Sequence, residues 1–325
     1  MITRRRFIQA PAAVAVAAHI PPARAQASRS MIRFICPFAA GANYDFVTRS
    51  VADVVGKTLG RTAIVENRPG AGGLIAVKAL LAAPADGSMS VLQTSSSFVS
   101  LPVFLKEANY DPLRDFTPVA AFVDTFSVIL IHSSVPARNI SELVAYGKAN
   151  PGQLTAGSAG QNTSGDIWTA MFAKRAGIDI LRVPYKGAAP MLMALEGGEV
   201  KIAITTYSEA LRASVNAGRL RLVAVTSPRR VAMLPDVPTV LETVPGYSID
   251  GNWIGLHAAR GAPAAEVAAI SGAVQKAVDD PEFRRKITGI FAEARYYSPD
   301  AFQAVVMATK TTWDRLAKEL NLTAS

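Results

Sequence analysis

The 325-residue chain is predicted to fold as an α/β protein with parallel sheets covered by helices. Short strand-like runs alternate with helical patterns almost throughout, which is typical of that fold class. Half of the residues are apolar and 18% are charged, which excludes a disordered chain. The length predicts about two domains, each large enough to bury its own core. A single cysteine excludes a scaffold held by internal disulfides.

The first 27 residues are predicted to be a signal peptide that takes the chain out of the cytoplasm. A basic start at residues 4–6 precedes an apolar run at 10–20, and small residues suited to cleavage follow at Ala25 and Ala27. The start resembles a twin-arginine export signal, and an ordinary secretory leader is the alternative. The apolar run is shorter than the about 20 residues that span a membrane, so we expect a mature protein that is not membrane-embedded.

The mature chain is expected to be mildly basic. Four of the 34 Lys and Arg residues lie in the leader, which has no acid, and this leaves 30 basic against 25 acidic residues, a net charge of +5. Such a balance favours anionic ligands over nucleic acid, and we expect no nucleic-acid partner.

Strands and helices are expected in alternation over the first half of the chain. Residues 45–59 are predicted to form a helix because Val47, Val51 and Val55 recur at every fourth position and give one apolar stripe. A glycine-rich turn at 67–73 follows the second strand and leads into another helical segment. The strands expected in this half are residues 31–37, 63–66, 90–94, 118–122 and 126–132.

The second half repeats this alternation with clear helix boundaries. Asn139 can cap a helix with Glu142 three residues later, and Pro151 ends that helix. Prolines between 235 and 245 form a stiff connector, after which one strand and three helical segments complete the chain. The last helix is expected to begin after Ser298. The strands expected in this half are residues 154–158, 180–183, 200–205, 220–226 and 252–258.

Patterns for catalysis and for metal binding are scarce. His132 and His257 each lie at the end of an apolar strand, where a structural role is the commoner one. The sequence around Ser158 resembles a nucleophile elbow, but Ala156 stands where that motif needs glycine. No metal-ligand spacing and no complete dinucleotide or phosphate-loop pattern occurs, so we expect no cofactor and no metal.

Three loops that join a strand to a helix favour a binding function. They cover residues 37–45, 94–97 and 158–164, and together they are rich in glycine, small residues and hydroxyls. In open α/β sheets, ligands bind beyond the carboxyl ends of the strands, where such loops lie. The helix after each loop presents unpaired N–H groups and a dipole that favour an anion. Ordinary caps and turns are the alternative explanation for any one loop.

Six short motifs recur in an order that resembles one protein family. The two most specific are Glu-Asn-Arg-Pro-Gly-Ala-Gly-Gly at 66–73 and Val-Pro-Tyr-Lys-Gly at 183–187. The others lie at residues 37–45, 85–87, 110–116 and 234–239. Over essentially the whole mature chain, the sequence resembles the Bug family of periplasmic solute receptors, the binding proteins associated with tripartite tricarboxylate transporters.

The resemblance implies a type II periplasmic binding protein fold, in which two α/β lobes are joined by two crossing strands and the ligand lies in the cleft. By that analogy, residues 126–132 and 252–258 would be the crossing strands. The first lobe would then be discontinuous, with residues 28–126 and 254–325 in lobe 1 and residues 127–253 in lobe 2.

The resemblance also implies which residues contact the ligand. The first loop would hold ordered water against one end of it, and the third loop would hold a carboxylate with backbone amides and hydroxyls. Ala39 and Ala42 stand where the family usually has proline and glycine. Thr205 stands where it often has aspartate, which favours an acid without an amine. The expected contacts are Phe38, Ala39, Gly41, Asn43, Ser96, Ser158, Gly160, Thr163, Ser164, Lys186 and Thr205.

The sequence is therefore interpreted as a monomeric periplasmic receptor without catalytic activity. It would capture a small organic carboxylate and deliver it to a membrane permease or a sensor protein. The alternative is an extracytoplasmic hydrolase or transferase on a similar two-lobed scaffold. The two differ in the role of Ser158, whose loss would abolish turnover in the enzyme and only weaken binding in the receptor.

Overall fold

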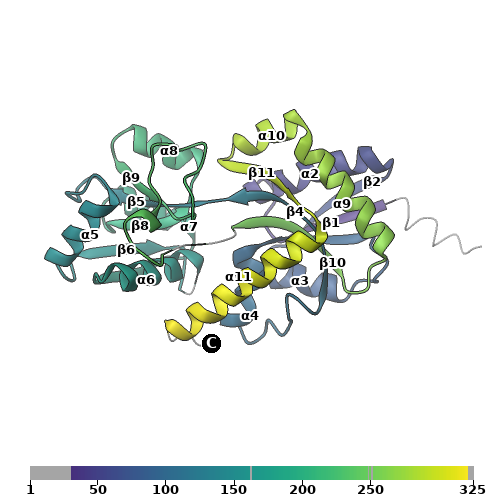
Figure 1. Cartoon of the computed structure of the whole chain (residues 1–325), viewed down its shortest axis with the longest axis horizontal. Helices are drawn as coiled ribbons and strands as arrows, with labels where there is room; N and C mark the ends of the chain where they lie inside the picture. Colours follow the sequence, from purple (N-terminus) through teal and green to yellow (C-terminus); the bar gives the residue numbers. More distant parts are fainter. Residues whose placement is uncertain (1–30, 162, 248, 250–251, 321–325) are drawn as a thin grey trace, which may run out of the picture.

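The computed structural model describes residues 31–161, 163–247, 249 and 252–320, which form two lobes with one sheet each (Figure 1). The predicted signal peptide at residues 1–27 lies outside the described residues. The sheet of lobe 1 has six strands in the order β11-β4-β10-β3-β1-β2. These strands are β1 (Met31–Cys36), β2 (Thr62–Asn67), β3 (Met89–Thr94), β4 (Phe116–Thr125), β10 (Trp253–Ala259) and β11 (Ala292–Tyr297).

Helices cover both faces of this sheet. Two separate apolar clusters fill the space between sheet and helices, and β1 contributes to both, with Cys36 at its end fully buried. The helices on one face are α2 (Asn43–Leu59), α9 (Ala264–Asp279) and α10 (Pro281–Thr288). Those on the other face are α3 (Leu74–Leu81), α4 (Leu101–Phe104) and α11 (Pro299–Glu319).

Lobe 2 repeats the layered arrangement around a five-stranded sheet of order β7-β6-β8-β5-β9. Its strands are β5 (Ser127–His132), β6 (Leu154–Ser158), β7 (Ile180–Pro184), β8 (Ile202–Thr206) and β9 (Leu220–Val225). The helices on one face are α5 (Ile140–Ala149) and α6 (Ser164–Ala176), and those on the other are α7 (Ala188–Glu196) and α8 (Glu209–Asn216).

The chain crosses between the lobes at two places that lie side by side. It passes from β4 to β5 through Phe126 and returns to β10 through Asn252. The Thr125 N–H donates to the Asn252 carbonyl at 2.6 Å, which joins the outgoing and returning segments. The Thr226 N–H donates to the Ser127 carbonyl at 2.9 Å on the lobe 2 side. The crossing is therefore a short, hydrogen-bonded pair of segments.

A third connection runs outside these two segments. The C-terminal half of α11 leaves lobe 1 and reaches α6 of lobe 2 (Figure 1). Glu319 accepts a hydrogen bond from Arg175 at 2.8 Å, and its backbone carbonyl accepts one from Lys174 at 2.7 Å. The cluster beneath α11 accordingly continues from lobe 1 into lobe 2.

The α/β prediction is confirmed, and each predicted strand overlaps a strand of the structure. The predicted caps are also present: the Asn139 side chain accepts from the Glu142 N–H at 2.9 Å, and Ser298 accepts from the Ala301 N–H at 3.3 Å. Both sheets are mixed, not wholly parallel, because β5 and β10 start at the crossing and run against their neighbours.

One strand, β11, was not predicted. The sequence predicts only helices in this part of the chain, since Ala, Glu and Arg at the start of this segment favour helix. In the structure the segment pairs antiparallel with β4 as an edge strand and buries only Ala292 and Ala294. Tertiary pairing has overridden local preference here.

Candidate functional site

The lobe 1 half of the candidate site is the loop between β1 and α2, and a buried carboxylate holds it from inside. Asp45 is 4% exposed and accepts hydrogen bonds from the Gly41 N–H at 2.9 Å and from Asn67 at 2.8 Å. Asn67 also donates to the Phe38 carbonyl at 3.0 Å. Asn67, the last residue of β2, therefore fixes both ends of the loop.

The charge on Asp45 is stabilised by these partners. Burial alone would raise its pKa, but the hydrogen bonds from Arg49, the Gly41 N–H and Asn67 hold the pKa below its ordinary value. Arg49 lies 3.0 Å from the carboxylate and donates as well to the Asn67 side chain at 2.9 Å. The loop is thus anchored on a charged network that remains ionised at neutral pH.

The outer side of this loop carries the predicted contacts. The Phe38 ring stacks on Tyr44 with ring centroids 4.2 Å apart. Ala39 and Asn43 are exposed, and Gly41 has a positive φ of 82°. The Gly41 N–H is already used by Asp45, and the Phe38 and Tyr44 rings also pack against the apolar cluster of lobe 1, so the exposed part of the loop consists of small side chains.

A second loop lies against the first. The turn Ser95–Val99 follows β3, and the Thr94 hydroxyl accepts from the Ser97 N–H at 3.1 Å. Gly73 packs between the loops: a Cβ there would lie 3.5 Å from the Cβ of Pro37 and 3.7 Å from that of Ser97. The backbone of Ser96 is therefore brought next to the first loop.

The lobe 2 half of the site is the loop that ends β6. The hydroxyls of Ser158 and Thr163 both donate to the Gly160 carbonyl, at 3.0 and 2.8 Å. Thr163 is the N-cap of α6, but its side chain does not cap the helix. Both side chains thus bind a carbonyl within the loop. The described residues offer no acceptor for the N–H groups of Ser164 and Gly165.

Tight packing fixes the start of α6 against β8. A Cβ at Gly165 would lie 2.6 Å from the Ile204 carbonyl oxygen, so only glycine fits there. This contact brings Thr205, the next residue of β8, beside the first turn of α6. Asp166 in the same turn is 3% exposed and forms an ion pair with Arg182 at 3.0 Å.

The segment containing Lys186 also lies against this loop. The Tyr185 N–H donates to the Ser158 carbonyl at 2.9 Å, and the Gly187 N–H donates to the Ala159 carbonyl at 3.1 Å. Lys186 is exposed, and its ammonium group has no hydrogen-bond or ion-pair partner among the described residues.

The predicted residues thus fall into two groups, one on each lobe. One holds Phe38, Ala39, Gly41, Asn43 and Ser96, and the other holds Ser158, Gly160, Thr163, Ser164, Lys186 and Thr205. Within the part of the chain that the structure describes, no hydrogen bond joins the two groups. They face the interlobe space from the carboxyl ends of β1, β3, β6, β7 and β8.

The arrangement offers little for nucleophilic catalysis. The Ser158 hydroxyl is engaged by a backbone carbonyl and has no histidine or carboxylate beside it among the described residues. His132 is hydrogen-bonded to Ser134 at 2.8 Å, and His257 is fully buried among aromatic rings. The described residues also hold no group of three or more His, Cys, Asp or Glu side chains that could bind a metal ion.

A cavity of about 1050 Å³ lies at the crossing and was not predicted from the sequence. It is lined by the end of β4, the end of α10, β11, part of α11 and the segment 227–233 after β9, and we call it the hinge cavity. In strand order, β11 flanks β4 on the side away from β3 and β1, and β9 flanks β5 on the side away from β8 and β6. The hinge cavity is therefore separate from the candidate site.

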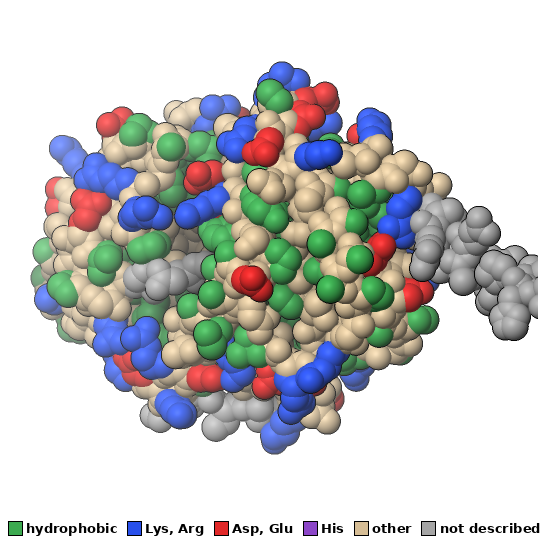
Figure 2. Space-filling model, turned by 45° about the vertical axis from the view of Figure 1, so that its right-hand side comes forward, with side chains coloured by type: hydrophobic (Ala, Val, Ile, Leu, Met, Phe, Trp, Pro, Cys, Tyr) green, Lys and Arg blue, Asp and Glu red, His purple; other side chains and the backbone are tan. Residues whose placement is uncertain are grey.

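Charges of both signs are interspersed over the face of the molecule drawn in Figure 2. In the described ranges, no helix is both long and apolar enough to cross a membrane.

Two mixed sheets in two lobes, with the candidate loops at the facing strand ends, are the architecture of a solute-binding receptor. The chain matches the model of the tripartite tricarboxylate transporter family receptor over residues 47–322 and belongs to this family. A relative from Cupriavidus necator, named "UPF0065 protein in gbd 5'region", is 30% identical over 324 residues, 99% of this chain and 97% of the relative.

Three solved structures are similar in fold and in sequence. The periplasmic binding protein BugD is 31% identical, with a TM-score of 0.75, over 90% of this chain and 98% of that one. Rpa4515 of R. palustris, solved with adipate, is 29% identical with a TM-score of 0.78, over 91% and 98%. MatC of Rhodopseudomonas palustris, solved with malate, is 27% identical with a TM-score of 0.72, over 88% and 98%. The resemblance to the Bug family and the two-lobed binding-protein fold are thereby confirmed.

Proposed function

We propose that this protein is a periplasmic receptor that captures a small organic carboxylate between its two lobes. The observation that carries the proposal is the start of α6, where the N–H groups of Ser164 and Gly165 are free among the described residues and the helix is fixed by contact with β8. A helix N-terminus favours an anion by about 0.3 to 1 kcal/mol, and by up to about 2 kcal/mol when partly buried. The adipate and malate in two related structures support this ligand class.

In this proposal the two groups of predicted residues close on opposite ends of the ligand. The loop 158–164 binds one carboxylate through backbone N–H groups, and the exposed Lys186 adds a positive charge nearby. The first loop and Ser96 meet the other end as the lobes approach. Lobe 1 then comprises residues 28–126 and 254–325, and lobe 2 comprises residues 127–253.

The proposal favours an acid without an amine. An ammonium group would need a free carboxylate, and Thr205 offers only a hydroxyl. The two nearby acids that could replace it are already paired, Asp166 with Arg182 at 3.0 Å and Glu209 with Arg212 at 2.6 Å. The ammonium group of an amino acid would have to share a carboxylate that already has an arginine partner.

The receptor would act without catalysis, as a monomer, and would deliver its ligand to a membrane permease or a sensor protein. Family membership supports this role, since the family model describes a receptor of a transporter. The route by which it reaches the periplasm can be tested by replacing Arg4 and Arg5 with lysine. Accumulation of precursor inside the cell is expected, and normal export would favour an ordinary secretory leader.

The most direct experiment identifies the ligand. Protein purified under native conditions is denatured, and the released small molecules are analysed by mass spectrometry, with a di- or monocarboxylate as the expected result. Calorimetry then compares the acid with its amide and with the matching amino acid. Equal affinity for acid and amide would contradict the carboxylate site, and preference for the amino acid would contradict the argument from Thr205.

Thr163→Val tests the loop itself. The substitution keeps the shape of the side chain and removes the hydroxyl that donates to the Gly160 carbonyl at 2.8 Å. We expect affinity for the carboxylate to fall by about 1 to 3 kcal/mol, because a hydrogen bond that orders the anion-binding loop is lost. Thr311→Val, which removes an exposed hydroxyl on α11, is the matched control and should leave the affinity unchanged.

A further inference from the structure

The hinge cavity has walls from both lobes, and arginines stand on each wall. Lobe 2 contributes Arg229 and Arg230 from the segment after β9, and lobe 1 contributes Arg284 from α10 and Arg295 from β11. The volume of about 1050 Å³ is comparable with that of small-molecule binding sites. Because the walls belong to different lobes, the width of the cavity depends on how the lobes are oriented.

The positive charge of these arginines is only partly compensated. Arg230 forms an ion pair with Glu242 at 2.7 Å. The guanidinium groups of Arg229 and Arg284, in contrast, form no hydrogen bond or ion pair with a described residue. Two of the four cations are therefore available to a ligand.

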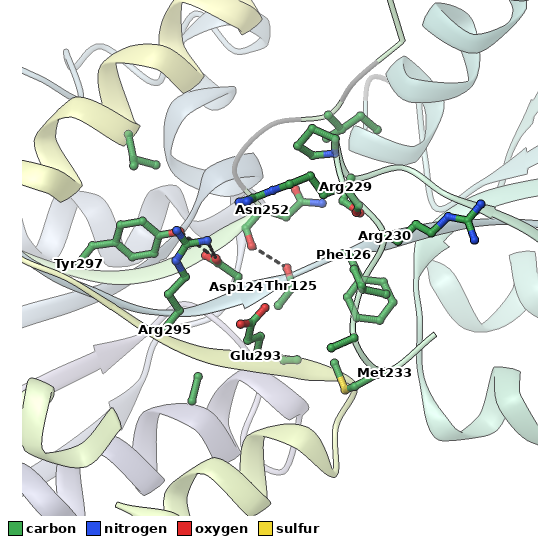
Figure 3. A pocket seen from close by; sticks show the side chains of 18 of the residues that line it. Asp124, Thr125, Phe126, Arg229, Arg230, Met233, Asn252, Glu293, Arg295 and Tyr297 are labelled. Carbon is green, nitrogen blue, oxygen red and sulfur yellow. Dashed lines mark hydrogen bonds and ion pairs between the residues drawn. The ribbon is translucent and has the colours of Figure 1, made fainter. Parts of the chain in front are cut away.

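Two acids, Asp124 and Glu293, line the same cavity and must be weighed against the arginines. Asp124 accepts a hydrogen bond from the Tyr297 hydroxyl at 2.8 Å and lies 3.6 Å from Arg295 (Figure 3). Burial raises the pKa of Asp124, against the lowering effects of Tyr297 and Arg295. Arg229 also attracts the Asp124 charge and lowers this pKa, but neither its guanidinium group nor that of Arg284 has a direct hydrogen-bond or ion-pair partner among the described residues.

A direct contact connects this cavity with the candidate site. Phe291, just before β11, reaches across to lobe 2, where its ring lies 4.9 Å from that of Tyr207 and 5.7 Å from the Arg212 guanidinium. Tyr207 follows β8, two residues after Thr205 of the candidate site. Movement of the wall that carries Arg284 and Arg295 would therefore displace Tyr207 and the end of β8.

We propose that the hinge cavity is a second ligand site, which binds a compact anion with two or more carboxylate or phosphate groups. The anion would bridge Arg229 of lobe 2 to Arg284 and Arg295 of lobe 1. Guanidinium groups suit this role because their planar fork binds carboxylate and phosphate oxygens in pairs. A bridging anion fixes the lobe orientation, so it changes the affinity of the candidate site, and the ligand there changes the anion affinity by the same factor.

The site is tested by calorimetric titration of the mature protein at low ionic strength, with citrate in one arm and pyrophosphate in the other. We expect at least one probe to bind. Binding of citrate alone identifies polycarboxylates as the ligand class, and binding of pyrophosphate alone identifies phosphates. Failure of both probes to bind overturns the proposal.

Variants locate the binding. Arg229→Gln combined with Arg284→Gln should lower the affinity for the probe by about tenfold or more, since each substitution removes a charge-assisted contact. Arg138→Gln removes an exposed arginine away from the cavity and should change nothing. Asp124→Asn keeps an acceptor for Tyr297 and removes the competing charge, so it should tighten binding several-fold.

Lys186→Gln separates this site from the candidate site. The hinge site is supported if Lys186→Gln leaves the probe affinity unchanged while the Arg229→Gln, Arg284→Gln double variant loses affinity. The reverse pattern would mean that the probe binds the candidate site, and it would overturn the hinge site while leaving the carboxylate receptor in place. Small-angle scattering gives a second readout, since a bridging anion should change the radius of gyration of the wild type and not of the arginine double variant.

Discussion

The two regions where the lobes meet outside the crossing segments are built in opposite ways. At one, α11 packs on α6, and Trp168 and Met171 face Trp313 and Leu316 around a narrow gap within one continuous apolar cluster. At the other, the hinge cavity separates β11 from the segment after β9, and the ring contact of Phe291 with Tyr207 adjoins it. One region is closely packed and largely apolar, and the other is open and charged.

This difference indicates how the lobes move. A receptor joined only by two short segments could open in any direction, whereas the α6–α11 contact adds a third attachment with its own ion pair between Arg175 and Glu319. Rotation that preserves the buried contact costs less than rotation that breaks it. The packed region is therefore expected to act as the pivot, and the hinge cavity as the space whose width changes.

The largest effect is expected from breaking the packed region. Trp313 is 5% exposed and meets Phe104 edge to face at 5.7 Å. Trp313→Ala should lower the free energy of unfolding by about 3 to 5 kcal/mol, because it leaves a cavity in the cluster shared by both lobes. Urea unfolding measures this. Met307→Ala on the same helix removes a 55% exposed side chain and should cost less than about 0.5 kcal/mol. Equal costs for the two would contradict a buried pivot.

The second-largest effect is expected from acid, which should lower the free energy of unfolding through a histidine in the same cluster. His257 is fully buried beside Phe98 and Phe302, and burial lowers its pKa to about 3. The folded state therefore keeps the ring neutral while the unfolded state takes up a proton below its ordinary pKa of about 6.5. The free energy of unfolding is therefore highest above the unfolded-state pKa of His257. It decreases as the pH falls, by about 2 kcal/mol between pH 7 and pH 5.

His257→Phe checks this assignment, since phenylalanine suits the surrounding rings and cannot titrate. The difference in unfolding free energy between wild type and variant should depend on pH over this range. A constant difference would mean that the ring takes up protons equally in the folded and unfolded states, which would contradict the lowered pKa of a buried His257.

The smallest effect is expected at the edge of the packed region. Glu319→Gln removes the negative partner of Arg175, and the loss should be about 1 kcal/mol or less because both groups are partly solvated. The lobes should nevertheless sample wider angles, which scattering or a pair of fluorescent labels would detect. Glu282→Gln breaks an ion pair within lobe 1, with Lys286 at 2.8 Å, and should leave the angle distribution unchanged.

Much of the fold could be predicted because its signals are local. Apolar runs mark strands such as β1 and β6, and Asn139 and Ser298 mark helix starts through caps that the structure contains. The strand β11 was not predicted because its first residues favour helix and only its pairing with β4 makes it a strand.

The candidate site was predictable only in part. The loops could be found from their composition and from resemblance to a family, but the network of Asp45, Asn67 and Arg49 that holds one of them depends on contacts up to 22 residues apart. The hinge cavity and the contact of Arg175 with Glu319, 144 residues apart, have no local signal at all. Such features depend on how the two lobes are placed, which no periodicity encodes.

Cys36 ends β1 immediately before the first binding loop, and its thiol is fully buried. Burial raises its pKa, against the hydrogen bond from Thr48, so the reactive thiolate is scarce in the folded protein. An oxidising compartment would therefore leave the folded chain free of covalent dimers. Because the chain has one cysteine, the rate at which a thiol reagent labels it reports how often β1 becomes exposed, and a ligand that stabilises the closed lobes should slow that labelling.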